Sequence, residues 1–158
     1  MKKITLISFC LAAFAFASCA GGGCPATGII PAPQQVTWGE GAFRMPAKLF
    51  YTTDLDGQDK ADLAAWMQRA ADGFFPASFA EASDGDMPAL ELLRTGDGAP
   101  ESYRLDVSRT KITLTAPDAA GLFYGLQSLA QLAGHHGRRI PAVTIVDAPR
   151  FGYRGFML

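Results

Sequence analysis

Residues 119–158 decide the fold, and they read AAGLFYGLQSLAQLAGHHGRRIPAVTIVDAPRFGYRGFML. In the first part of this stretch, two sets of apolar side chains recur at helical spacing, so most of the helix circumference is apolar. The two sets are Leu122, Leu126, Leu129 and Ala133 on one face, and Phe123, Ala130 and Leu132 on the adjoining face. The pattern predicts a helix packed against a sheet, with Gly134 as its left-handed C-cap.

Two glycines on one side of this helix predict a close contact. Gly121 and Gly125 are four residues apart, and a neighbouring segment can approach the helix closely where no side chain is present. After the helix, Ala142–Val146 is typical of a strand. The strand is expected to end at Asp147-Ala148-Pro149, because proline cannot donate to a sheet ladder. A further apolar run, Tyr153–Leu158, follows.

A hairpin and a second helix precede this stretch. Apolar and polar side chains alternate from residue 103 to residue 115 on both sides of a turn at Arg109-Thr110, which indicates a hairpin with one buried face. A helix is predicted at residues 60–72, with Asp59 as its N-cap. Its buried face would carry Leu63, Trp66, Met67, Ala70 and Phe74. We therefore expect an α+β domain, in which a small antiparallel-rich sheet carries two helices packed on one face.

Shorter strands are predicted near the start of this domain. Val36–Trp38 and Ala42–Phe43 flank Gly39-Glu40-Gly41, which is typical of a turn. Leu49–Thr52 and Ala89–Leu93 are the other candidate strands.

The first residues have the pattern of an export signal. Lys2-Lys3 precede an apolar run at Ile4–Phe16, which is shorter than the roughly 20 residues of a membrane span. Phe16-Ala17-Ser18-Cys19 then resembles a bacterial lipobox, in which the cysteine is lipidated and becomes the first mature residue. We expect a lipoprotein signal peptide at 1–18, and the lipidated Cys19 with a flexible tether at 19–28. Ordinary signal cleavage near Ala17 is the alternative.

Composition excludes several classes of function. The formal net charge is −1, with acidic and basic residues mixed along the chain, so there is no basic surface for nucleic acid. No cysteine follows Cys24, so the predicted domain at 29–146 has neither a disulfide nor a cysteine-based metal site. We expect no metal and no cofactor.

Two histidines and an acidic segment of the chain lack the pattern of a metal site. His135-His136 are adjacent and lack an evident third ligand, which favours a solvated loop. The segment 54–59, DLDGQD, fails as a calcium loop, because its glycine comes too early and Ala65 stands where a bidentate glutamate is needed. The remaining candidates for a functional site are three charged residues in the last part of the chain: Asp147, Arg150 and Arg154. Surface or interdomain salt bridges are the simplest roles for them.

The segment 145–158, IVDAPRFGYRGFML, resembles the start of the catalytic barrel in glycoside hydrolase family 20, the β-N-acetylhexosaminidases. Upstream, Gly121–Leu132 resembles the last helix before that barrel, Tyr103–Ala116 the preceding hairpin, and Ile29–Pro33 the opening strand. The resemblance implies a non-catalytic α+β domain at 29–146, followed at 147–158 by the first strand of a truncated (β/α)8 barrel.

The same resemblance implies a function. Family members remove terminal N-acetylglucosamine or N-acetylgalactosamine from glycans with retention, and the substrate's own acetamide oxygen attacks the anomeric carbon. Their Asp-Glu pair lies further along the barrel, so we expect no catalytic residue in this chain and no activity from it alone. Arg154 matches the arginine that holds the ring hydroxyls of the terminal sugar, while Asp147 and Arg150 are expected to fix the interdomain junction.

The expected partners are an N-acetylhexosamine-terminated glycan, the missing catalytic barrel, and a membrane through the lipid on Cys19. The expected location is the bacterial cell envelope, periplasmic or at the cell surface. The alternative is a free-standing surface lipoprotein module that binds glycan or protein.

Overall fold

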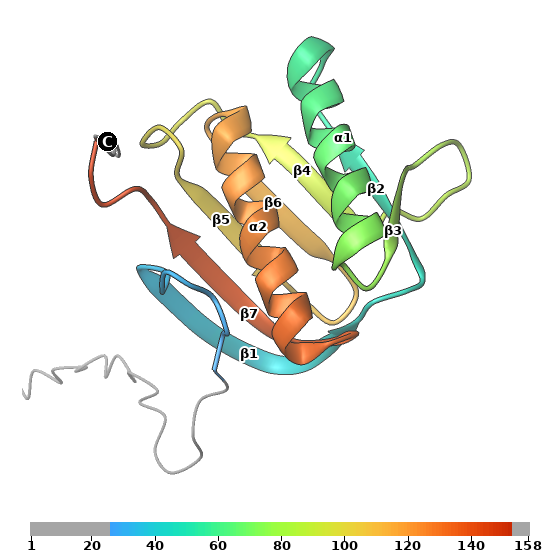
Figure 1. The fold of residues 1–158 in the computed structure, drawn as a ribbon, viewed down its shortest axis with the longest axis horizontal. Helices are drawn as coiled ribbons and strands as arrows, with labels where there is room; N and C mark the ends of the chain where they lie inside the picture. The colour runs from blue at the N-terminus through green and yellow to red at the C-terminus, as the bar shows by residue number, and fades with distance from the viewer. Residues whose placement is uncertain (1–25, 153–158) are drawn as a thin grey trace, which may run out of the picture.

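The computed structural model describes residues 26–152, so the predicted signal peptide, Cys19 and Arg154 lie outside the described residues. The described chain forms two helices and seven strands (Figure 1). In chain order they are β1 (Gln35–Arg44), β2 (Lys48–Thr53), α1 (Gly57–Gly73), β3 (Ser78–Glu81), β4 (Leu90–Arg94), β5 (Tyr103–Val107), β6 (Ile112–Ala116), α2 (Ala119–His136) and β7 (Arg139–Asp147).

The strands form one sheet in the order β1-β7-β5-β6-β4-β2-β3. The pairs β1–β7, β7–β5 and β5–β6 are antiparallel, whereas β6–β4, β4–β2 and β2–β3 are parallel. The α+β class is confirmed, and the sheet is antiparallel in one half only. The parallel pair β2–β3 follows from the connection β2-α1-β3, because neighbouring parallel strands need a crossover that returns the chain to the start of the next strand.

Both helices cover the same face of the sheet, as predicted (Figure 1). Alternate strand residues point toward them, and Leu92, Leu105, Leu114 and Ile145 are fully buried there. Leu126 of α2 is 1% exposed, which confirms that this helix is deeply buried. No helix within residues 26–152 is both long enough and apolar enough to cross a membrane.

The two glycines of α2 allow the close packing that their spacing predicts. A Cβ on Gly121 would lie 2.2 Å from the carbonyl oxygen of Ser102 and 2.8 Å from the Cβ of Ala116. A Cβ on Gly125 would lie 2.2 Å from Cδ1 of Leu114. Helix α2 therefore lies so close to the hairpin that a residue with a side chain would not fit at either position.

Helix α1 begins earlier than predicted. Asp56, not Asp59, is the N-cap residue; its backbone is extended, and its side chain makes no capping hydrogen bond. Asp59 lies in the first turn, where a carboxylate still interacts favourably with the helix dipole. Leu63, Met67 and Ala70 are buried as predicted, but Phe74 follows the helix end and is 61% exposed.

Helix α2 extends beyond the predicted end. Gly137, with φ of 64°, is its C-cap, whereas Gly134 is helical. His135 and His136 therefore form the last helical turn and are not a loop. The ring of His136 packs edge-on to Trp38 of β1, with 6.1 Å between ring centroids, and this contact gives the extra turn a partner on the sheet.

The sheet also differs from the prediction near its first strand. Gly39-Glu40-Gly41 is not a turn: β1 continues through it, with a shift in register between Trp38 and Ala42. Beyond the shift, Ala42 faces Pro141, which has no N–H to donate to the ladder. The structure adds the strand β3, and Ile29–Pro33 is irregular where the resemblance implied a strand.

Candidate functional site

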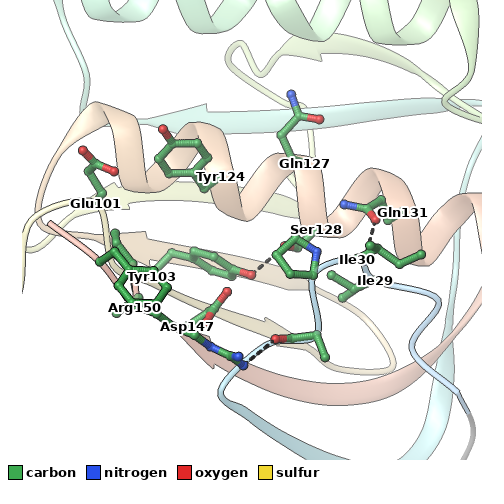
Figure 2. A pocket seen from close by; sticks show the side chains of 15 residues that line it. Ile29, Ile30, Glu101, Tyr103, Tyr124, Gln127, Ser128, Gln131, Asp147 and Arg150 are labelled. Carbon is green, nitrogen blue, oxygen red and sulfur yellow. Dashed lines mark hydrogen bonds between the residues drawn. The ribbon is translucent and has the colours of Figure 1, made fainter. Parts of the chain in front are cut away.

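A pocket of about 620 Å³ lies where the two ends of the described chain meet, and we call it the junction pocket (Figure 2). Its walls come from four places: the segment before β1, the start of β5, the outer side of α2, and the segment after β7. The residues that line it are Ile29–Ala32, Glu101, Tyr103, Tyr124, Gln127, Ser128, Gln131 and Asp147–Phe151.

A buried pair of hydroxyl groups joins β5 to α2 at the base of this pocket. The phenol oxygen of Tyr103 lies 2.5 Å from Oγ of Ser128 (Figure 2). Burial raises the pKa of Tyr103 to about 12, and the charge of Asp147 adds to this effect, although the bond to Ser128 opposes it. Tyr103 is therefore protonated at neutral pH. The hydrogen bond between the two hydroxyl groups joins β5 to α2.

The carboxylate of Asp118 accepts hydrogen bonds from two backbone N–H groups beside the pocket, one of them that of Glu101. Asp118 is the N-cap of α2: its Oδ1 accepts from the backbone N–H of Gly121 at 2.7 Å. Its Oδ2 accepts from the backbone N–H of Glu101 at 2.9 Å. Glu101 has φ of 63°, a left-handed conformation that costs a residue with a side chain roughly 1–2 kcal/mol. The bond from Asp118 helps to hold Glu101 in this conformation at the pocket wall.

The segment after β7 is tied to the segment before β1. Oδ1 of Asp147 accepts from the backbone N–H of Gln34 at 3.1 Å, and the side-chain amide of Gln34 donates to the carbonyl of Ala148 at 2.8 Å. Arg150 donates through Nη2 to the carbonyl of Ala32 at 3.2 Å. Within residues 26–152, Asp147 and Arg150 thus bind backbone groups of the segment before β1, and neither forms the salt bridge considered from the sequence.

The histidine pair lies away from this pocket, at the C-terminal end of α2. Burial lowers the pKa of His136, and the neighbouring His135 lowers it further, while a backbone hydrogen bond with Ala26 opposes the shift. Within residues 26–152, no group of three or more His, Cys, Asp or Glu side chains is arranged to hold a metal ion.

The sequence pointed to two of the junction residues, Asp147 and Arg150, and the structure places both at the pocket. Arg154 and Cys19 lie outside the described residues. Sequence reasoning missed Tyr103, Ser128 and the glutamines of α2. A signal for them was present: Gln127, Ser128 and Gln131 are polar residues on successive turns of an otherwise apolar helix.

Residues 26–148 match the family model described as glycosyl hydrolase family 20, domain 2. The chain is 30% identical over 118 residues to the N,N'-diacetylchitobiase of Vibrio harveyi, a match that covers 65% of this chain and 13% of that protein. It is 28% identical over 141 residues to the β-hexosaminidase of Porphyromonas gingivalis, covering 82% of this chain and 18% of that one.

Solved structures agree with these relatives. The N-acetyl-β-hexosaminidase of Streptomyces plicatus, solved in complex with thio-NAglucal, superposes with a TM-score of 0.66 at 26% identity. That superposition covers 83% of this chain and 28% of the Streptomyces chain. The chain thus spans less than a third of the length of each of these three proteins.

Proposed function

Because the chain belongs to glycosyl hydrolase family 20 and carries its domain 2, we propose that it is the leading part of a β-N-acetylhexosaminidase. The match over residues 26–148 carries this proposal, since it covers the whole sheet and both helices. The enzyme removes terminal N-acetylglucosamine or N-acetylgalactosamine from glycans. The acetamide oxygen of the substrate acts as the nucleophile, so retention of configuration needs no carboxylate nucleophile from the protein.

In this proposal the described domain supports the catalytic one. The roles of orienting the acetamide and protonating the leaving oxygen belong to an Asp-Glu pair in a barrel of roughly 250 residues that follows the present sequence. Arg154 belongs to the sugar site. A planar guanidinium can donate to two neighbouring ring hydroxyls at once, which an ammonium group cannot do with the same geometry.

The test is to express the full reading frame and to assay an aryl N-acetyl-β-glucosaminide. We expect turnover by the wild type. Arg154→Ala should lower kcat/KM by about 30- to 1,000-fold, which corresponds to roughly 2–4 kcal/mol for a lost charged donor. Arg154→Lys should recover only part of the loss.

Arg44→Ala is the matched control, because Arg44 is an exposed arginine of β1 on the same domain, and it should leave kcat/KM unchanged. An inactive full-length protein would contradict the proposed enzyme. A fully active Arg154→Ala variant would remove Arg154 from the sugar site.

The enzyme is anchored to the bacterial cell envelope through lipid on Cys19 in this proposal. The support is the order of a basic start, an apolar run and Phe16-Ala17-Ser18-Cys19. A fatty-acid probe fed to cells should label the wild type and the Cys24→Ser control but not Cys19→Ser. Equal labelling of Cys19→Ser and the wild type would refute the anchor.

A further inference from the structure

The segment before β1 lies against the last turn of α2, and we call residues 26–30 the entry segment. Gly28 has φ of 67°, and a Cβ built on it would lie 2.6 Å from Cβ of His135. A hydrogen bond joins the side chain of His136 to the backbone of Ala26. The two histidines at the end of α2 therefore form the surface on which the entry segment rests.

The far end of the entry segment is held by a hydrogen bond and by the hydrophobic core. The backbone N–H of Ile30 donates to Oε1 of Gln131 on α2 at 2.9 Å (Figure 2). Ile29, next to it, is 7% exposed and belongs to the core. Both isoleucines also line the junction pocket, so a movement of the entry segment away from α2 would alter one wall of that pocket.

The imidazole of His136 lies where a positive charge is poorly accommodated. Its Nε2 is buried and has no hydrogen-bond partner within residues 26–152. On the side of β1 the ring meets Trp38, which carries no charge. A proton on Nε2 would place an N–H donor and a positive charge in a buried position, away from any acceptor among these residues.

The charged groups around His136 do not compensate for such a charge. The ring of His135 lies beside it, with 4.7 Å between ring centroids, and would repel it when both are protonated. No ion pair in the described part of the chain involves either histidine. The other charged residues on the adjoining elements are exposed: Glu40 and Arg44 of β1, and Arg138 and Arg139 after α2.

Protonation of His136 and release of the entry segment are therefore linked. Burial lowers the pKa of His136 below its ordinary value of 6.5, and His135 lowers it further, while the bond to Ala26 opposes the shift. With the entry segment in place, the ring is neutral at pH 7. When the segment moves away, water reaches the ring and the proton binds more readily. A fall in pH below the ordinary histidine value must then favour the open arrangement.

We propose that His136 is a pH-sensitive latch, which holds the entry segment on α2 when it is neutral and releases the segment when it is protonated. Opening breaks the hydrogen bond of Ile30 and displaces part of the wall of the junction pocket, and it leaves the sheet intact. The inference does not depend on the proposed function, because every group in the latch belongs to the described domain.

Hydrogen-exchange mass spectrometry of the full-length protein at about pH 7.5 and about pH 5.5, on either side of the ordinary histidine pKa, measures the latch. Each rate is divided by the intrinsic exchange rate at the same pH, so the remaining change reports opening of the structure. Peptides that cover residues 26–32 should lose protection several-fold at the lower pH, and peptides from residues 119–134 should keep theirs. Equal protection of residues 26–32 at both pH values would overturn the latch, and so would a parallel loss in α2.

Two substitutions identify the histidine that responds. His136→Phe keeps an aromatic ring beside Trp38 but cannot bind a proton, so the entry segment should be equally protected at both pH values. His135→Asn is the matched control, because His135 is an exposed histidine on the same helical turn, and this variant should keep most of the response. A response that persists in His136→Phe, or that disappears in His135→Asn, would overturn the proposal.

A third substitution opens the latch without a change in pH. The added methyl group of Gly28→Ala would meet Cβ of His135, and alanine is strained at this positive φ. Residues 26–32 should therefore exchange several-fold faster than in the wild type already at pH 7.5, with α2 still protected. A Gly28→Ala protein with wild-type protection at pH 7.5 would show that the entry segment does not rest on the histidines, and would overturn the proposal.

Discussion

At the scale of single residues, the glycines of α2 show how a missing side chain determines packing. Gly121 faces a backbone carbonyl, that of Ser102, which cannot rotate away as a side chain could. Gly134 lies on the same helix, and a Cβ there would meet nothing within 4 Å. The same substitution at the two positions should therefore have opposite effects on stability.

We expect Gly121→Ala to lower the free energy of unfolding by about 1–3 kcal/mol, because the added methyl group must push the hairpin away from α2. Gly134→Ala should raise it by about 0.5–1 kcal/mol, because alanine loses less conformational entropy in a helix. Urea denaturation of both variants measures these changes. A Gly121→Ala protein as stable as the wild type would contradict the close contact.

At the scale of elements, the bond between Tyr103 of β5 and Ser128 of α2 connects the centre of the sheet to the helix above it. Burial raises the pKa of Tyr103 from its ordinary value of 10.0 to about 12 in the folded state. Between pH 10 and 12, the unfolded chain therefore loses this proton while the folded protein keeps it. The contribution to stability is complete below pH 10 and is lost as the pH rises toward 12.

Denaturation midpoints of the wild type should accordingly decrease between pH 10 and pH 12, and Tyr103→Phe should show a smaller decrease over the same range. The pKa of Tyr51 is also raised, chiefly by burial, so only the difference between the two proteins reports on Tyr103. Parallel curves for the two proteins would show that Tyr103 does not titrate differently on folding.

At the scale of the whole molecule, one hydrophobic core connects both halves of the sheet with both helices. The first strand in sequence, β1, pairs with the last, β7. A polypeptide of residues 26–152 should therefore unfold in a single transition, with coincident near- and far-ultraviolet circular dichroism curves.

Leu126→Ala should lower the stability of this polypeptide by about 2–5 kcal/mol, because the side chain it shortens is 1% exposed. Both dichroism curves should shift together. Two separate transitions, or a loss below about 1 kcal/mol, would contradict a single core centred on α2. The same polypeptide should not hydrolyse the aryl substrate.

The elements predicted well are those whose pattern is local. The hairpin at β5 and β6 alternates residue by residue, and α2 carries an apolar pattern on most of its circumference, so neighbouring residues were enough to define both. The strand β3 was missed because it has only four residues and little alternation. The start of α1 and the end of α2 were misplaced. Asp59 and Gly134 are residue types that commonly cap helices, but neither has the backbone conformation of a cap here.

By itself, the sequence determined the α+β class, the buried helix and the family resemblance in the segment 145–158, because each depends on residues close together in the chain. Only the tertiary structure decided the parallel half of the sheet, the bulge in β1 and the junction pocket. The hydrogen bond between Gln34 and Asp147 shows the reason most clearly: the two residues are 113 apart in sequence, and no local pattern encodes their contact. It exists only because β1 pairs with β7, which brings the residues before β1 beside those that follow β7.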